Sequence, residues 1–334
     1  MPKFTKFTIL IDYAHGEILN LTDNEFKLFN DLLIDRGYTS LINYSNKLNS
    51  ELLRDTDLLI IGCPVNSHLL KEEVHDIIDF VTAGGCLLVM SDYGGDIVQK
   101  TNLNELTGYF GIYFENTAVK STSNPGVYTK TAPVITEFNY DNEVITKNVK
   151  KIIMGGCCSL RLGKEAFPIA FSGPNSWLEA YDNESNIWFR NEDKNVPVIA
   201  AAIYGQGRVI AIGDIDMISN NPLFGLNSLD NRRIIMNFLN WFQAPVSYER
   251  TIFWILEQIS NKRDEIFEIK NVMHEMMEKM RNMEERLITM ETIQRQLQHE
   301  LLNHLEEHNR EFDGLSEESG ATGKKYEKAR SHGT

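Results

Sequence analysis

The sequence contains no long apolar segment. A membrane-spanning helix requires about 18 consecutive apolar residues. No apolar run near that length occurs among the 334 residues. The amino-terminal stretch MPKFTKFTILID reaches a charged residue at Asp12 and lacks the small residues of a signal-peptide cleavage site. We therefore expect a first strand at this point, no membrane span, and a cytoplasmic location.

Blocks of basic residues are equally scarce. The chain has 33 Lys and Arg against 47 Asp and Glu, which gives a net charge of −14. Proteins that bind nucleic acids normally present a basic face. Here Lys and Arg gather only near the carboxyl end, at Lys324, Lys325, Lys328 and Arg330. Nucleic acid is therefore not the expected partner.

Cysteines are few, and none of them is spaced as Cys-x-x-Cys, so a zinc site of the usual kind is not expected. Cys63 is a possible nucleophile, but Pro64 beside it has no N–H to offer an oxyanion. We expect reduced, buried thiols and no cofactor. The four cysteines are Cys63, Cys86, Cys157 and Cys158.

A nucleophile elbow is also missing. The place for one is the glycine-rich turn at residues 91–96, directly after an apolar run. The elbow requires a glycine two residues after the nucleophile, and Ser91 has Tyr93 there instead. The nearest half-match puts Asp92 in the nucleophile position. The sequence thus favours a protein without catalytic activity.

Strand-like and helix-like segments alternate in the first part of the chain, which predicts βαβ units around a mostly parallel sheet. Thr22 and Glu25 have the spacing of a capping box, and Gly37 would end the helix that this box begins. We predict strands at residues 7–11, 41–44, 57–62 and 86–90, a short helix near Ser50, and an amphipathic helix at 71–82.

The second part of the chain is richer in β-like pieces. Short ones fill residues 133–190, and two longer ones at 196–203 and 208–212 are joined by the turn-forming sequence YGQG. A last helix is predicted at 229–242. We expect residues 1–245 to form one α/β domain, with a mostly parallel, flavodoxin-like sheet flanked by helices.

After Pro245 apolar residues recur at alternating steps of three and four, which is typical of a coiled coil. The predicted coiled coil covers residues 247–311, and the roughly eight heptads of its seam would be about 85 Å long. So long a helix needs a partner helix to bury its stripe. The predicted seam consists of Ile252, Ile255, Ile259, Ile266, Ile269, Met273, Met276, Met280, Met283, Leu287, Met290, Leu297 and Leu301.

Charged residues beside the seam favour a parallel homodimer. In such a pair, Glu265 faces Lys270, Lys279 faces Glu284, and Arg286 faces Glu291 of the other copy. The Met-rich middle of the seam is adaptable, so a heteromeric partner stays open. Residues 312–334 have almost no apolar side chains, and we expect them to be disordered.

Several acidic residues and one histidine follow the predicted strands. Because ligand crevices lie at the carboxyl ends of parallel strands, these side chains are candidates for a divalent metal or a polar ligand. The simpler interpretation is that they cap helices and satisfy backbone donors, and it leaves no metal site. The candidates are Asp12, His15 and Glu17, then Asp92 and Asp96, then Asp214 and Asp216.

Residues 84–119 contain a series of short motifs. They are Gly84-Gly85, the strand Leu87 to Met90, Gly94-Gly95-Asp96, Thr101-Asn102-Leu103-Asn104, Phe110-Gly111-Ile112 and Asn116-Thr117-Ala118-Val119. This series resembles the GIFT domain, a family named for a gliding-motility ABC-transporter auxiliary protein and a subunit of the intraflagellar transport B complex. The sequence GQGRVIAIGDIDMISNN and the LDNRRIIMNFLNWF that follows also resemble the end of such domains, so the resemblance covers about residues 5–243.

The resemblance implies a fold like that of class I glutamine amidotransferases, in a family regarded as non-catalytic binding modules. The leading hypothesis is thus a cytoplasmic scaffold, similar to an intraflagellar transport subunit, with a head that binds a protein partner and a coiled coil that makes it oligomeric. One alternative is a hydrolase or amidotransferase-like enzyme that uses His15 and the strand-end carboxylates. Another is a soluble accessory component of an ABC transporter.

Overall fold

The computed structural model describes residues 7–44, 47–122, 132–244, 277–283, 286–288, 290–291 and 293–298. The chain divides into two units, Met1–Glu257 and Gln258–Thr334. Each unit is described by itself below, and the first is called the head.

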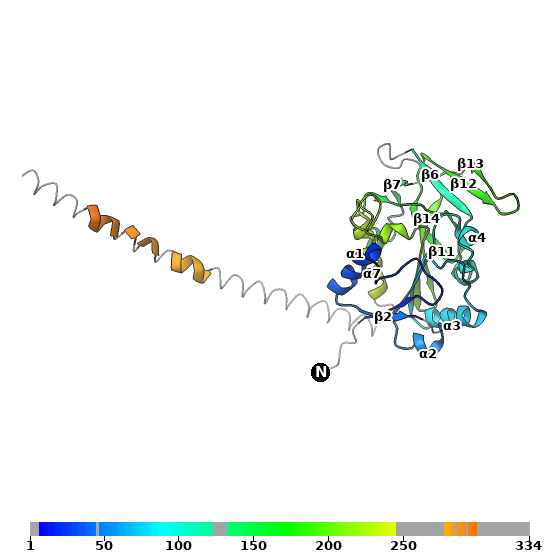
Figure 1. Ribbon diagram of the computed structural model, residues 1–334, viewed down its shortest axis with the longest axis horizontal. Helices are drawn as coiled ribbons and strands as arrows, with labels where there is room; N and C mark the ends of the chain where they lie inside the picture. The colour runs from blue at the N-terminus through cyan, green and yellow to red at the C-terminus, as the bar shows by residue number, and fades with distance from the viewer. Residues whose placement is uncertain are drawn as a thin grey trace, which may run out of the picture. The chain divides into compact units, whose positions relative to one another are not determined.

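The head is built on an eight-stranded sheet, as far as its described residues go (Figure 1). The five strands from β2 to β15 run parallel, and the remaining three pair antiparallel with their neighbours. The order is β2 (Thr39–Asn43), β1 (Thr8–Asp12), β3 (Leu58–Gly62), β4 (Cys86–Met90), β15 (Gly207–Ile212), β14 (Pro197–Tyr204), β11 (Ala166–Phe171) and β8 (Glu137–Phe138). The predicted mixed α/β class with a mostly parallel main sheet is confirmed.

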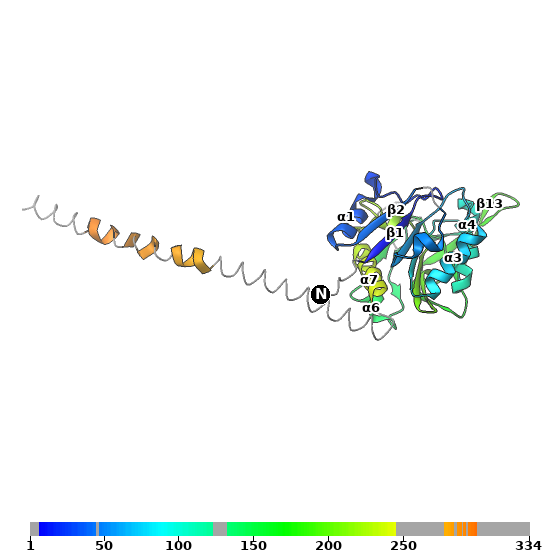
Figure 2. The same cartoon turned by 90° about the horizontal axis from the view of Figure 1, so that it is seen from below.

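Helices cover both faces of this sheet (Figure 2). Alternate residues of each strand point to opposite faces, so Ile9 and Ile11 pack in one apolar cluster and Leu10 packs in the other. Helices α1 (Lys27–Asp35) and α7 (Asn231–Gln243) belong to the first cluster, and α3 (Lys71–Thr82) belongs to the second. The central strands β3 and β4 are buried throughout, which explains their uninterrupted apolar sequences.

Residues 133–190 do not stand apart from the main sheet. Strands β8 and β11 extend it, while the other strands of this region pair in small sheets with one another or with earlier strands. The small sheets are β10 (Leu160–Leu162) with β5 (Ile112–Phe114), β13 (Ile187–Asn191) with β12 (Ser176–Asp182) and β6 (Thr117–Ser121), and β7 (Val134–Ile135) with β9 (Ile152–Ile153).

Short helices connect the strands. They are α2 (Ser50–Leu53), α4 (Gly95–Gln99), α5 (Leu103–Thr107) and α6 (Glu143–Thr146), with 3-10 turns at Asn24–Phe26, Gly108–Phe110 and Asp216–Ile218. The predicted hairpin is confirmed as β14 and β15, and the predicted helix at residues 71–82 is confirmed as α3.

The predicted capping box is wrong. The side-chain oxygen of Asn20 accepts both the N–H and the hydroxyl of Thr22, at 3.0 and 2.6 Å. The hydroxyl thus donates within this local turn, and no side chain caps the 3-10 turn that begins after Asp23. The chain therefore passes through a 3-10 turn at Asn24–Phe26, and the α-helix begins only at Lys27.

The described residues of the second unit are helical. Five of the predicted seam residues lie among them and are 58% to 66% exposed: Met280, Met283, Leu287, Met290 and Leu297. The other eight, Ile252, Ile255, Ile259, Ile266, Ile269, Met273, Met276 and Leu301, lie outside the described residues, as does the segment 312–334. The long coiled coil therefore stays a prediction. Among the described helices, none is long and apolar enough to cross a membrane.

Gly207 lies where β15 packs closely against α3. A Cβ at this position would lie 2.1 Å from the carbonyl oxygen of Val81 and 2.3 Å from that of Gly85. Both atoms belong to the backbone and cannot turn away, so we predict that Gly207→Ala lowers the free energy of unfolding by about 3 kcal/mol. Urea denaturation of the full chain measures this loss.

Gly156→Ala is the matched control, because a Cβ there would meet only ordinary contacts, of which the nearest is 3.5 Å from the Tyr93 ring. Its unfolding free energy should change by less than about 0.5 kcal/mol. Equal stability of the two variants would contradict the close approach of β15 to α3.

Candidate functional site

Strand β1 ends at Asp12, and the next five residues turn sharply at the carboxyl edge of the sheet. The turn is closed by local hydrogen bonds, since Asp12 accepts from the N–H of Ala14 and Glu17 accepts from the N–H of His15. Gly16 has a positive φ of 68°, which glycine adopts without strain. These bonds bring the side chains of Asp12, His15 and Glu17 together.

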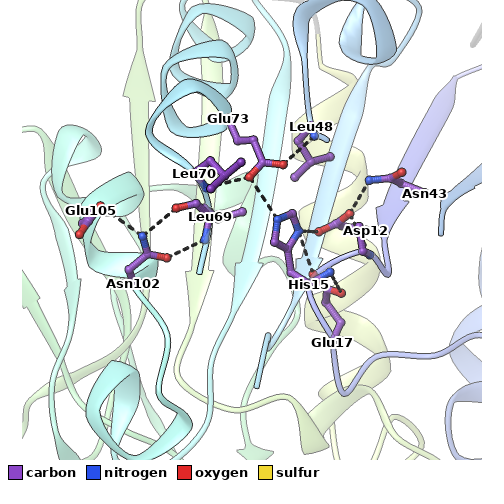
Figure 3. A network of polar contacts seen from close by, with 11 residues as sticks. Asp12, His15, Glu17, Asn43, Leu48, Leu69, Leu70, Glu73, Asn102 and Glu105 are labelled. Atoms are coloured by element: carbon purple, nitrogen blue, oxygen red, sulfur yellow. Dashed lines mark hydrogen bonds and ion pairs between the residues drawn. The ribbon is translucent and has the colours of Figure 1, made fainter. Parts of the chain in front are cut away.

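The imidazole ring of His15 lies between two buried carboxylates (Figure 3). Its Nδ1 is 2.5 Å from Asp12 Oδ2, and its Nε2 is 3.2 Å from Glu73 Oε2. Asn43 on β2 donates to the other oxygen of Asp12 at 2.7 Å. The ring is thus held from both sides, and the group combines residues from β1, β2 and α3.

Glu73, which sequence reasoning missed, is the residue that joins this group to the rest of the head. It lies in the first turn of α3, where its carboxylate accepts from the N–H of Leu70 at 2.7 Å and from that of Leu48 at 3.0 Å. A Glu at the third helical position is the second half of a capping box. Leu70 at the cap hides the pattern, because its side chain has no oxygen.

The charges in this group depend on one another. Burial disfavours the imidazolium, but the hydrogen bond to Asp12 and the charges of Asp12, Glu73 and Glu17 raise the pKa of His15 from 6.5 to about 9. Burial and the neighbouring carboxyl group of Asp12 raise the pKa of Glu17 from 4.5 to about 8. Burial also opposes ionisation of Asp12, yet the hydrogen bond with His15, the neighbouring Glu17 and the charge of His15 lower its pKa overall. The raised pKa values of His15 and Glu17 favour the protonated form of each group at neutral pH.

Asp92, Asp214 and Asp216 form a second group after β4 and β15. Asp214 is fully buried and accepts from the N–H groups of Gly155 and Asp216, at 2.8 and 2.9 Å. Burial and the other two aspartates raise its pKa well above the ordinary value. Burial likewise raises the pKa of Asp216, with a contribution from the charge of Glu25. Among the described residues, no hydrogen bond or ion pair links this group to His15.

Asp96 has a third, separate place. Its carboxylate accepts from the hydroxyl of Thr101 at 2.7 Å and from the N–H groups of Leu103 and Asn104, at 3.0 and 2.8 Å. Asn102 in turn bonds both backbone groups of Leu69, at 2.8 and 3.0 Å. The GIFT-like residues of this stretch therefore fix the path of the backbone.

Cys63 has one property of a nucleophile elbow. Its φ is 59°, a strained value for a residue with a side chain. However, the thiol is fully buried, and burial raises its pKa well above the ordinary value, with contributions from Asp92, Asp214 and Asp216. Nucleophilic attack needs an accessible thiolate. The thiol of Cys63 is neither accessible nor easily ionised. The side chain of Ser91 is fully buried as well.

With the geometry established, the chain can be compared with known proteins. The family model of the IFT52 GIFT domain matches residues 8–166, just under half of the chain. This match supports the resemblance to the GIFT domain over those residues. No curated protein matches the sequence.

Solved structures of similar proteins were also found. The mmIFT52 N-terminal domain is similar with a TM-score of 0.59 at 19% identity, over 70% of this chain and 96% of that one. A protein described as ThuA-like from Bacteroides uniformis gives a TM-score of 0.46 at 14% identity, over 73% of this chain and 94% of that one. A beta-galactosidase from Rahnella sp. R3 gives 0.42 at 13% identity, over 72% of this chain and 32% of that one. The first of these similarities shows a shared fold.

The clamp formed by Asn104 yields a prediction on stability. Its side chain donates to the carbonyl of Phe114 at 2.8 Å and accepts from the N–H of the same residue at 2.7 Å. Asn104→Ala leaves both backbone groups without these partners and should lower the unfolding free energy by about 2 kcal/mol. Thermal and urea denaturation measure the loss. The exposed Asn183→Ala should leave stability unchanged, and a loss of the same size there would refute the clamp.

The pKa of Asp92 predicts how stability depends on pH. Burial, with a contribution from Asp216, raises it from 3.8 to about 7. A raised folded pKa means that the folded state holds the proton more tightly, so this stability is complete below about pH 4 and is lost as the pH rises through 7. Asp92→Asn should therefore reduce the loss of unfolding free energy between pH 5 and pH 8 by about 2 kcal/mol.

Urea denaturation of the full chain at both pH values measures this difference. Asp141→Asn is the control, since Asp141 is exposed and its variant should follow the wild type. An Asp92→Asn variant with the wild-type pH dependence would show that Asp92 does not titrate in this range.

Proposed function

We propose that this protein is a non-enzymatic cytoplasmic scaffold, similar to a subunit of intraflagellar transport. A head of the GIFT family binds a protein partner, and a carboxyl-terminal coiled coil holds two copies together in parallel. The main support is the match of residues 8–166 to the IFT52 GIFT domain. The amidotransferase-like or flavodoxin-like description of the fold remains a prediction of the sequence.

The burial of the possible nucleophiles supports a head without catalytic activity. Cys63 and Ser91, which follow β3 and β4, are fully buried. The polar residues at the same edge of the sheet mostly bond backbone groups and one another, as Asp96, Glu73 and Asp214 do. Such residues stabilise a framework, and a framework is what a binding module needs.

The exposed seam supports association through the second unit. Met280, Met283 and Leu287 follow one another at steps of three and four, and each is more than half exposed. Burial of apolar surface stabilises by about 25 cal/mol per Å², so a partner helix along this stripe brings a gain that the isolated helix lacks. The sequence pairs Lys279 with Glu284 and Arg286 with Glu291, which favours a parallel second copy.

Light scattering with multi-angle detection tests the assembly. We expect the full chain to be a dimer and Leu287→Glu to be a monomer, because a charge at the seam cannot be buried in the pair. Ile288→Glu is the matched control, since the adjacent residue lies off the predicted seam and its variant should remain a dimer. A monomeric wild-type chain would overturn the homodimer and would leave a heteromeric partner for the seam.

A further inference from the structure

Glu17 has a buried oxygen without a donor. Its side chain is 0% exposed, and Oε1 has no hydrogen-bond partner among the described residues, whereas Oε2 accepts from the N–H of His15. A buried carboxylate oxygen normally has a partner, and its absence costs free energy. This oxygen lies 4.0 Å from Nδ1 of His15.

Three potential metal ligands meet at this point. One ligand atom from each of Asp12, His15 and Glu17 lies within 4.8 Å of the other two. The ring nitrogen that faces the carboxylates is Nδ1. The opposite nitrogen, Nε2, is turned to Glu73.

Glu73 has the position of an orienting partner. Metal-binding histidines usually donate their second ring N–H to a carboxylate, which fixes the ring and leaves the other nitrogen free to bind the ion. Glu73 Oε2 lies 3.2 Å from Nε2 and is itself held by the N–H of Leu70. Three carboxyl groups thus surround one imidazole and offer oxygen ligands beside its ring nitrogen.

We propose that Asp12, His15 and Glu17 bind one divalent transition-metal ion of the zinc type, with Glu73 as the residue that positions the imidazole. A nitrogen ligand together with two carboxylates favours such an ion over magnesium or calcium, which prefer ligand sets made of oxygen alone. The role is structural, because the ion would tie the turn after β1 to α3 through His15.

The adjustments that the ion requires are small. Ligand atoms about 2.0 to 2.1 Å from a tetrahedral zinc ion lie about 3.3 Å apart. The 2.5 Å contact between Asp12 and His15 would therefore open, and the 4.0 Å separation between Glu17 and His15 would close, each by less than about 1 Å. A water molecule would supply the fourth ligand, on the side where the His15 side chain is 10% exposed.

Calorimetric titration of Zn²⁺ into the full chain, first treated with a chelator, tests the proposal. We expect one site that Glu17→Gln and His15→Gln each weaken by about 100-fold or more, and that Glu73→Gln weakens by about 10- to 100-fold. Glu72→Gln and His75→Gln are matched controls, because these residues are exposed on the same helix as Glu73. Their affinity for Zn²⁺ should equal that of the wild type.

X-ray absorption at the zinc edge of the wild-type complex gives a readout that does not depend on the folding of any variant. One nitrogen and two or three oxygen ligands support the site. Sulfur ligands, several imidazoles, or no binding above the controls would overturn it. The result is independent of the oligomeric state, so it is separate from the test of the proposed function.

Discussion

The burial of Glu73 is the constraint on which the carboxyl edge of the sheet depends. A carboxylate removed from water must be matched by donors, and this one accepts from Leu48, Leu70 and His15. Those three residues lie before α2, at the beginning of α3 and after β1. One side chain therefore fixes three connections that are separate in the sequence, and it does so at the edge where α/β sheets usually place their sites.

Helices and strands could be predicted where the spacing of apolar residues in the sequence agrees with their burial in the structure. Residues 71–82 and 86–90 have the bounds that the sequence predicts, since one apolar face or one fully apolar run leaves no competing pattern. The turns were less predictable, because a side chain can satisfy the backbone in several ways. At Thr22 the bonds donated to Asn20 are found in place of the expected cap, and at Glu73 the cap has no sequence signature because Leu70 at the cap position has no side-chain oxygen.

The sequence predicted which residues belong to the candidate site, but not which of them lie next to one another. Asp12, Asp92 and Asp214 all follow strands, as expected, yet the side on which each carboxylate lies depends on the register of the turn after the strand. Leu10, two residues before Asp12, packs in one apolar cluster, whereas Met90 and Ile212, two residues before Asp92 and Asp214, pack in the other. One shared edge therefore holds two acidic groups. The sequence predicts the residues of both groups, and the structure shows that they form two separate groups.

The two units solve the problem of apolar burial in different ways. In the head, every residue of β3 and β4 is buried between helices of the same chain, so its stability is an internal property. In the second unit, Met280, Met283 and Leu287 present a regular apolar stripe that is more than half exposed. A single helix has no second face against which to bury such a stripe, and intrinsic helix propensity alone gives it only marginal stability. Association of the proposed kind would bury this stripe and would make the free energy of folding of the helix depend on protein concentration.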